Sequence, residues 1–157
     1  HANAQPEQRL ISEVRVWAAE QGLENEDLIF TSQEDKAYEL GVEPKIVSDL
    51  FRISNVFIFP TVSENSSLVL LESMLSANLL VLNTQVGTLR EHAGDSALYF
   101  DFTNREGTKE NEKYFLDLAR IIASQFENDK ALQVKRRALK NFNYDVIYKQ
   151  IERVLYE

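Results

Sequence analysis

Two glutamates, Glu64 and Glu72, stand eight positions apart in the stretch SENSSLVLLESM, residues 63–74. A carboxylate accepts two hydroxyl groups strongly, and one beside an oxocarbenium-like centre stabilises the positive charge that develops there. Ser66 and Ser67 stand between them at the expected start of a helix, where hydroxyls cap free N–H groups and the dipole favours an anion. The residue types therefore predict a site for hydroxyl groups and an anion.

The position of Glu72 on its helix leaves two interpretations open. At about 100° per residue, Glu72 lies beside the stripe of Leu68 and Leu75 rather than opposite it. Only Glu72, Ser73 and Ser76 form a polar stripe, so we expect this helix to be mostly buried. A carboxylate there must then be hydrogen-bonded or face a cleft. The alternative is that Glu72 simply lies on the narrow solvent stripe, and periodicity alone does not decide.

The bulk composition of the 157 residues excludes several classes of site. The formal net charge of −8 disfavours nucleic acid as the main partner, and Lys135, Arg136 and Arg137 are typical of a solvated helix face. The chain has no cysteine, which excludes a disulfide framework, a thiolate metal site and a cysteine nucleophile, and agrees with a cytoplasmic location. With only two histidines and no cluster of carboxylates, we expect no metal site. No apolar run has the length of a transmembrane segment, and the first residues do not have the pattern of a signal peptide.

Four short apolar runs, separated by helical patterns, must position these residues. They predict an α/β fold with a Rossmann-like parallel sheet, helices on both faces and further helices at the carboxyl end. The runs are DLIFT (27–31), VFIFP (56–60), LLVLN (79–83) and ALYFDF (97–102). Ligands bind such sheets at the carboxyl ends of the strands. This rule selects the segments 32–43, 61–67, 84–90 and 101–108.

Helical patterns surround these runs. Leu10, Val14 and Trp17 recur at helical spacing between Pro6 and Gly22, and we expect Trp17 to be a core residue. Further helices are expected after Pro44, after Ser66, over 88–94, and over a stretch with an apolar face of Phe115, Leu118, Ala119, Ile122 and Phe126. Asn128 and Asn143 are expected to cap two terminal helices, over 128–157, that pack on or extend from a single domain covering 1–157.

The stretch VFIFPTVSENSSLVLLESMLSANLLVLNTQVGTLREHAGDSALYFDF (56–102) resembles the carboxyl-terminal, donor-binding domain of retaining GT-B glycosyltransferases of the GT4 family (group 1). Members of that family carry a strand, a Glu, seven residues, a second Glu, then a helix and the next strand. Glu64 and Glu72 have that spacing, residues 87–91 match the family's Gly-Gly or Gly-Thr segment, and Gly94 with Asp95 precedes the last strand. The similarity extends from about Leu28 to Phe102.

The resemblance implies a role for each residue of the site. Glu64 would be the catalytic residue nearest the transferred sugar, and Glu72 would bind the hydroxyls of the nucleotide ribose. The diphosphate would meet the segment Asn65, Ser66, Ser67 and Leu68, together with Gly87 and Thr88. No metal or other cofactor would be required, and the donor substrate would be a UDP- or GDP-linked sugar.

The chain also departs from the family pattern. Asn65, Ser66 and Ser67 replace the usual Gly-aromatic-Gly, and residues with a Cβ limit how closely the backbone approaches a phosphate. Arg90 stands where proline is common. Two strands and a basic Arg/Lys pair expected before the first helix have no counterpart, and neither has the acceptor domain. We therefore expect a fragment of a longer enzyme, inactive by itself, whose partners are a nucleotide sugar and the rest of its own chain.

Several alternatives stay open at this stage. The lost glycines favour a degenerate glycosyltransferase-like domain that binds a partner without chemistry, whereas a phospho-acceptor receiver would need an aspartate that FIFPT does not offer. An exposed sheet edge would permit oligomers, and the full-length protein could be peripheral at a membrane. Tyr38 could stack on a nucleobase, although packing on its own loop is favoured. His92 is expected to be a satisfied histidine rather than a base.

Overall fold

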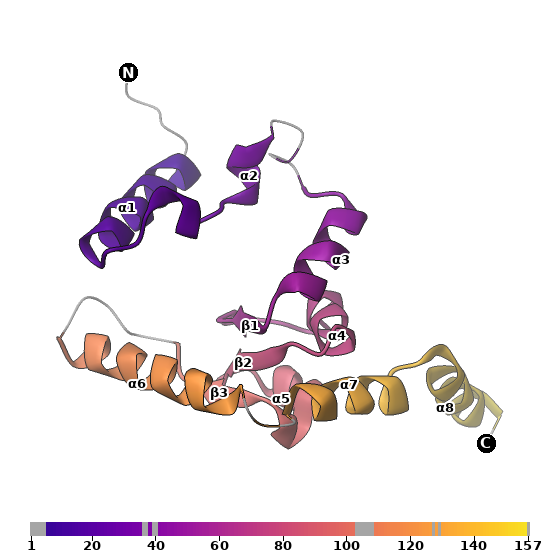
Figure 1. Cartoon of the computed structure of the whole chain (residues 1–157). Helices are drawn as coiled ribbons and strands as arrows, with labels where there is room; N and C mark the ends of the chain where they lie inside the picture. Colours follow the sequence, from indigo (N-terminus) through magenta and orange to yellow (C-terminus); the bar gives the residue numbers. More distant parts are fainter. Residues whose placement is uncertain are drawn as a thin grey trace. The chain divides into compact units, whose positions relative to one another are not determined.

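The computed structural model describes residues 6–35, 38, 41–102, 109–126, 128 and 130–156 (Figure 1). The chain divides into two compact units, His1–Val47 and Ser48–Glu157. No helix in the described part is long and apolar enough to cross a membrane.

The first unit is built mainly on helix α1, Pro6–Glu20. Gly22 adopts a φ of +82° just after the helix, a conformation that glycine takes without strain, and so ends it as predicted. Ile11 and Ala18 are buried, but Trp17 is 62% exposed, so the prediction of a core tryptophan is wrong. The reason is the small size of the unit, in which the residues after α1 do not cover this side of the helix, and Leu23 and Ile29 are exposed as well. Short helices follow in η1, Asn25–Asp27, and α2, Thr31–Glu34.

The predicted strand DLIFT (27–31) is wrong as secondary structure. Leu28 and Phe30 have extended dihedral angles, with φ of −126° and −105°, but no described segment pairs with them. Thr31 instead begins α2, so the segment 32–43 does not follow a strand. Apolar, β-favouring residues extend the backbone locally, whereas a strand also needs a neighbour to satisfy its N–H and C=O groups. Helix α3, Pro44–Ile53, then leads into the second unit and begins at the predicted proline.

The second unit contains a parallel three-stranded sheet, which confirms the predicted α/β, Rossmann-like class. Its strands are β1 (Val56–Phe59), β2 (Leu79–Asn83) and β3 (Leu98–Phe100), in the order β1-β2-β3. Phe59 pairs with Leu82, and Asn83 with Phe100, so the carboxyl ends of all three strands meet at one edge. Every residue of β2 is buried, as expected for the central strand of a covered sheet.

One face of this sheet carries the core of the unit. Helices α4 (Leu68–Leu75), α5 (Gly87–Ala93) and α7 (Lys130–Asn141) pack on it. The core cluster combines Leu80 and Leu82 of β2 with residues from all three helices: Leu70, Met74, Leu89, Ala93, Val134 and Ala138. Because β1-α4-β2 and β2-α5-β3 are both crossovers in the same direction, α4 and α5 belong on the same face.

Helix α6, Lys109–Gln125, approaches the other face of the sheet. Tyr99 packs against the core cluster, so its neighbour Phe100 points to the other face of the sheet. The Phe100 ring meets Tyr114 of α6 at 6.0 Å between centroids. The Tyr114 hydroxyl also accepts the N–H of Asp101 at 3.0 Å. Of the predicted apolar face of α6, Leu118 is buried, while Phe115 is 40% exposed.

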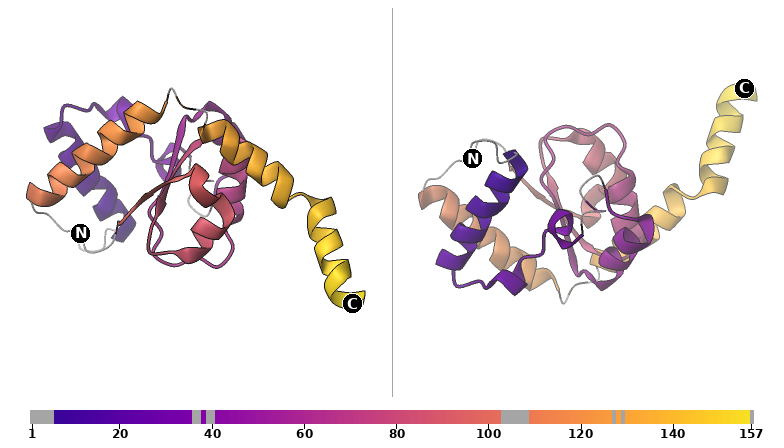
Figure 2. Two further views of the ribbon diagram at one scale, coloured as in Figure 1. Left: turned by 90° about the horizontal axis from the view of Figure 1, so that it is seen from below. Right: turned by 90° about the horizontal axis from the view of Figure 1, so that it is seen from above.

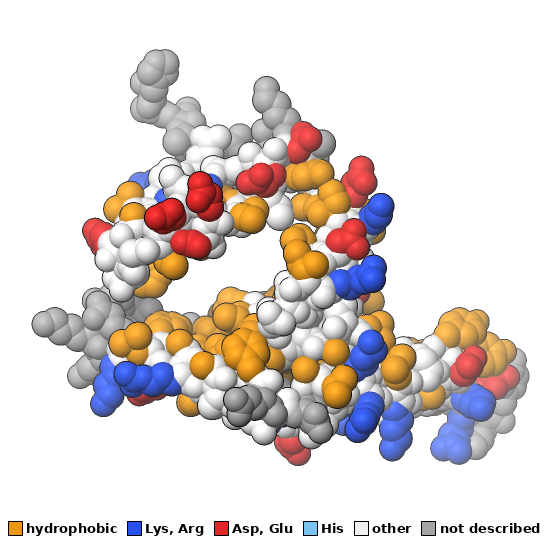
Figure 3. All heavy atoms as spheres, in the orientation of Figure 1, with side chains coloured by type: hydrophobic (Ala, Val, Ile, Leu, Met, Phe, Trp, Pro, Cys, Tyr) orange, Lys and Arg blue, Asp and Glu red, His pale blue; other side chains and the backbone are white. Residues whose placement is uncertain are grey.

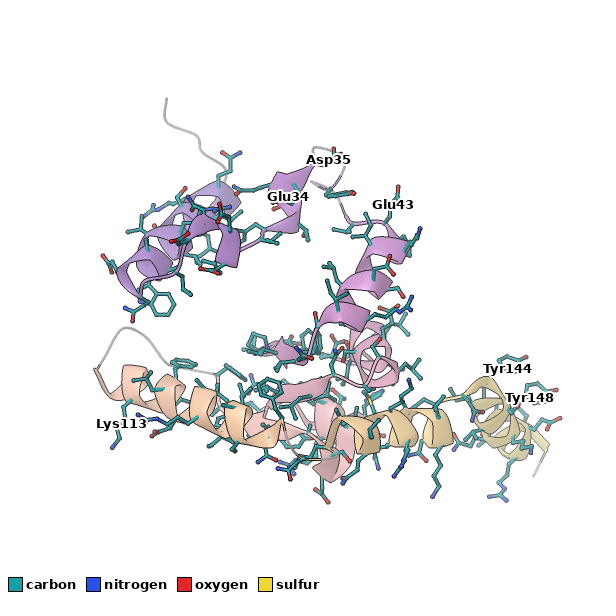
Figure 4. The ribbon with its side chains drawn as sticks, in the orientation of Figure 1. Glu34, Asp35, Glu43, Lys113, Tyr144 and Tyr148 are labelled. Carbon is teal, nitrogen blue, oxygen red and sulfur yellow. The ribbon has the colours of Figure 1, made fainter. Side chains whose placement is uncertain are left out.

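Helix α8, Tyr144–Tyr156, continues beyond α7 and away from the sheet (Figure 2). The Asn143 side chain accepts the N–H of Val146 at 3.0 Å, which confirms it as the cap of α8. Tyr144 and Tyr148 lie side by side on α8, with ring centroids 5.9 Å apart (Figure 4). Asn128, in contrast, donates back to Gln125 and the Ser124 carbonyl, so it binds the end of α6 instead of capping α7.

Helix α7 is fastened to α5 by one side chain. Arg137 donates from Nε to the carbonyl of His92 at 2.6 Å and from a terminal nitrogen to that of Glu91 at 2.8 Å. These carbonyls belong to the last turn of α5, which has no further helical N–H groups to meet them. Gly94 follows with a φ of +58°, and a Cβ there would meet the Arg137 guanidinium at 2.9 Å. This contact between α5 and α7 therefore requires both the arginine and the glycine.

The hydroxyl of Tyr99 binds next to this contact, at the end of α5. It donates to the Gly94 carbonyl at 2.6 Å, and the Arg90 guanidinium lies over the ring, 4.1 Å from its centroid. Burial raises the pKa of Tyr99, because a phenolate is solvated poorly there. The ring thus supports the connection between α5 and β3 in its neutral form.

Candidate functional site

The loop from β1 to α4 carries Glu64 at the carboxyl edge of the sheet, as the strand pattern predicts. Val62, Ser63, Asn65 and Ser66 are exposed, whereas Glu64 is half-buried. The loop thus turns most of its side chains to solvent and holds the glutamate against the protein.

The end of this loop is fixed by the cap of α4. Ser67 is buried, has an extended backbone and accepts the N–H of Leu70 at 3.1 Å through its hydroxyl oxygen. This is the geometry expected of a serine N-cap, and it satisfies one of the free donors of the helix start. The predicted helix after Ser66 is confirmed.

The end of β2 and the first turn of α5 contact the Glu64 loop at two points. The Thr88 hydroxyl donates to the Glu64 carbonyl at 2.7 Å, and Asn83 donates from Nδ2 to the Thr61 carbonyl at 3.0 Å. Asn83 is fully buried, and its Oδ1 accepts the N–H of Gln85 at 3.1 Å. The structure thereby brings two of the segments selected from the sequence, 61–67 and 84–90, into direct contact.

The Glu64 carboxylate is itself in contact with the backbone. Its Oε1 accepts the N–H of the next residue, Asn65, at 3.0 Å. The carboxylate therefore lies against its own loop. The loop itself is at the edge of the sheet where β1 and β2 end.

The environment of Glu72 answers the question that periodicity left open. Glu72 is exposed on α4, and so are its neighbours on the same side, Leu68 at 71% and Leu75 at 44%. The prediction of a mostly buried helix is therefore wrong. The buried stripe is Leu70, Ser73 and Met74, because these residues face the sheet and α7.

Ser73 shows why the apolar pattern of α4 misleads. The pattern predicts Ser73 on the polar stripe, yet it is fully buried, and its hydroxyl donates to the carbonyl of Leu70 at 2.9 Å. A serine that back-bonds within its own helix behaves as a small core residue. Glu72 has no hydrogen bond to the Glu64 loop within the described residues, so the structure does not join the two carboxylates directly.

The remaining predicted residues lie around the same edge. Gly87 begins α5 and is exposed, and a Cβ there would meet nothing within 4 Å. Leu68 begins α4 with its side chain in solvent, and Asn65 and Ser66 are exposed beside Glu64. The exposed residues Asn65, Ser66 and Leu68 thus flank Glu64, whose loop Thr88 contacts, and the space around Gly87 is open.

Two residues that hold the site were missed in the sequence. Asn83 and Thr61 fix the two loops to each other. A signal for Asn83 exists, since it is the polar end of the apolar run LLVLN, and a buried amide there needs partners. The bond joins the end of β2 to the loop after the neighbouring strand β1, and such a contact has no signature in the sequence.

The other segments selected from the sequence contribute less. Asp101 and Phe102 follow β3, while 103–108 lie outside the described residues. Tyr38 is half-buried in the first unit, so its role beside a nucleobase stays a prediction. His92 meets the Thr88 carbonyl through Nδ1 at 2.7 Å and stacks on Phe142, with centroids 5.1 Å apart, as a satisfied histidine does.

Within the described ranges, no three histidine or carboxylate side chains gather closely enough to hold a metal ion. No family model, curated protein or solved structure matches this chain.

Proposed function

We propose that this chain is the donor-binding part of a retaining glycosyltransferase of the GT-B, GT4-family type, and that it belongs to a longer enzyme. It would hold a nucleotide-diphosphate sugar while the acceptor is bound elsewhere in the full-length protein. The observation that carries the proposal is the hydrogen bond from Thr88 to the Glu64 carbonyl. It joins the Glu-x7-Glu segment and the Gly-Thr-Leu-Arg-Glu segment, which are far apart in sequence, at the ends of two adjacent parallel strands.

The proposed chemistry follows from the residue types at this edge. Glu64 would lie beside the transferred sugar and stabilise positive charge at its anomeric carbon while the diphosphate leaves. The exposed Glu72 would accept ribose hydroxyls, and the first N–H groups of α4, near Ser66 and Leu68, would meet the diphosphate. Open space in front of Gly87 supports a ligand that approaches the backbone closely.

A non-catalytic, glycosyltransferase-like interaction domain is the second candidate. Two hydrogen bonds favour it. The buried hydroxyl of Ser67 already accepts the N–H of Leu70, and the Glu64 carboxylate already accepts the N–H of the adjacent Asn65. In this case the loop would be a stable structural turn, and nucleotide sugars would not bind.

The test is an NMR titration of the chain with UDP, GDP, ADP and their glucose derivatives, comparing Glu72→Gln with Glu152→Gln. Glu152 is an exposed glutamate on α8, outside the segments proposed to bind the nucleotide, so it is a matched control. We expect one nucleotide to shift signals over 61–72 and 84–91, and Glu72→Gln to weaken its affinity about 10- to 100-fold, since charge-assisted hydrogen bonds are lost.

A second variant tests the catalytic role. In the full-length enzyme, Glu64→Gln should lower the transfer rate about 100-fold while nucleotide affinity changes little. The proposal fails if a folded sample responds to no nucleotide, or if Glu72→Gln and Glu152→Gln bind alike.

A further inference from the structure

One peptide group connects Thr88 to the Glu64 carboxylate. The peptide between Glu64 and Asn65 accepts the Thr88 hydroxyl at its carbonyl, at 2.7 Å, and donates its N–H to the Glu64 Oε1, at 3.0 Å. Because a peptide group is planar and rigid, its carbonyl and its N–H turn together. Fixing the carbonyl therefore also fixes the donor that holds the carboxylate.

The loop depends on this contact because other elements hold its two ends, whereas in the described part of the chain its middle has only a bond within the loop, from the Thr61 hydroxyl to the Ser63 carbonyl at 2.9 Å. Asn83 holds the Thr61 carbonyl at the start, and Ser67 joins the cap of α4 at the end. Between them, the exposed side chains of Val62, Ser63, Asn65 and Ser66 supply little packing. The Thr88 hydroxyl reaches the middle of the loop, at a half-buried position where a hydrogen bond is screened less by water.

The helix that presents Thr88 is itself held from its other end. Arg137 of α7 binds the carbonyls of Glu91 and His92, and the Thr88 carbonyl accepts from His92. A donor on a rigid element positions its partner more precisely than a donor on a loop does. The first turn of α5 is therefore a fixed reference for the Glu64 loop.

We propose that Thr88 is a positioning residue for Glu64, acting through the Glu64–Asn65 peptide group, and not a direct contact of the donor diphosphate. The proposal rests on the proposed function, which gives the Glu64 carboxylate its task beside the sugar. It also changes the role expected of Thr88 from the sequence, since the hydroxyl is already committed to the Glu64 carbonyl.

The structural part of the proposal is tested without any ligand. We would measure water exchange of the Asn65 amide by NMR in Thr88→Val, which keeps the shape and loses the hydroxyl, and in Thr88→Ser, which keeps the hydroxyl. Thr84→Val is the matched control, because it makes the same change on an exposed residue just after β2. We expect exchange to become about fivefold faster in Thr88→Val and to stay within about twofold in Thr88→Ser and Thr84→Val.

Protection of the β2 amides at Leu80 and Leu82 reports whether each variant is folded. If Thr88→Val loses this protection, Thr88→Ala replaces it, since it removes the hydroxyl without adding bulk. Unchanged Asn65 exchange in a folded variant without the hydroxyl would overturn the proposal.

The functional part of the proposal is tested by measuring the affinities of two ligands, a nucleotide sugar and its nucleoside diphosphate. Both are measured for the unmodified chain and for the Thr88 variants. Thr88→Val should weaken the nucleotide sugar about fivefold and leave the nucleoside diphosphate within about twofold, because Glu64 serves the sugar, and Thr88→Ser should restore both. Equal weakening of the two ligands would make Thr88 a diphosphate contact and overturn the positioning role. If the unmodified chain binds neither ligand, the proposed function fails, while Asn65 exchange still decides whether Thr88 positions Glu64.

Discussion

Buried amide side chains join elements in this protein where the backbone alone cannot. Asn78 is fully buried at the start of β2, and its Nδ2 donates to the carbonyls of Phe51 at 3.0 Å and Ser54 at 2.5 Å. These carbonyls lie at the end of α3, where the last carbonyl groups of a helix have no backbone N–H group of the helix to accept. Asn83 plays a similar part at the other end of β2, where it holds the Glu64 loop.

Replacing Asn78 tests this view at the scale of one residue. Asn78→Ala leaves two carbonyls without their donor, and we expect a loss of about 2 kcal/mol of unfolding free energy. Part of the cost is offset, because the Asn78 Oδ1 is buried and finds no partner within the described residues. Urea unfolding followed by circular dichroism measures the difference, with Asn55→Ala as the exposed control. Equal stability of the two variants would contradict the bridging role.

At the scale of elements, the turn from α4 to β2 carries strain. Ala77 has a φ of +62°, a left-handed conformation that costs a residue with a Cβ roughly 1 kcal/mol, and it follows the C-cap Ser76. The N–H of Asn78 donates to the Ser73 carbonyl at 3.2 Å, and the N–H of Ala77 donates to the Met74 carbonyl at 3.2 Å. At helix ends with this backbone geometry, the left-handed position is usually occupied by glycine.

Ala77→Gly should therefore stabilise the protein by about 0.5–1 kcal/mol, because glycine adopts this φ without the Cβ penalty. A thermal unfolding scan would show the rise in melting temperature. Ala123→Gly is the control with the opposite sign, since an exposed glycine inside α6 should cost up to about 1 kcal/mol. A lower melting temperature for Ala77→Gly would show that the turn is not strained.

At the scale of the whole chain, the packing is concentrated in the second unit. The core cluster and the residues packed against it run from Phe57 to Phe142. In the described part of the first unit, only Ile11 and Ala18 are buried hydrophobic residues. Hydrophobic side chains of α8 are also exposed, including Val154 at 83%, and Figure 3 shows them along one side of that helix. Burial drives folding, so the two units should differ in their ability to fold alone.

We expect residues 42–157, which keep all of α3, to fold without the preceding segment. Their amide spectrum should superpose on that of the full chain for β2 and α7, since these elements take their core partners from within the second unit. A peptide of residues 1–41 should show the narrow amide dispersion of a chain with too little core. A narrow spectrum for residues 42–157 would contradict this distribution of stability.

The sequence by itself predicted most elements of the second unit, because apolar runs and helix caps act over a few residues. The strands at 56–59, 79–83 and 98–100 lie within predicted runs, and Pro44, Ser67 and Asn143 mark helix starts as expected. The α/β class followed from this pattern. The placement of Glu64 at a strand end followed as well, since a parallel sheet fixes which loops share an edge.

Only the tertiary structure decided which apolar residues are covered and which loops touch. DLIFT and Trp17 have the composition of a strand and a core residue, but each would need a partner surface that its local sequence does not supply. Leu68 and Leu75 are as apolar as Leu70, yet packing against the sheet selects one side of α4 and leaves Glu72 in solvent. The bonds from Asn83 to Thr61 and from Thr88 to Glu64 join residues more than 20 positions apart, and such contacts arise from the three-dimensional arrangement of the strands rather than from any local pattern.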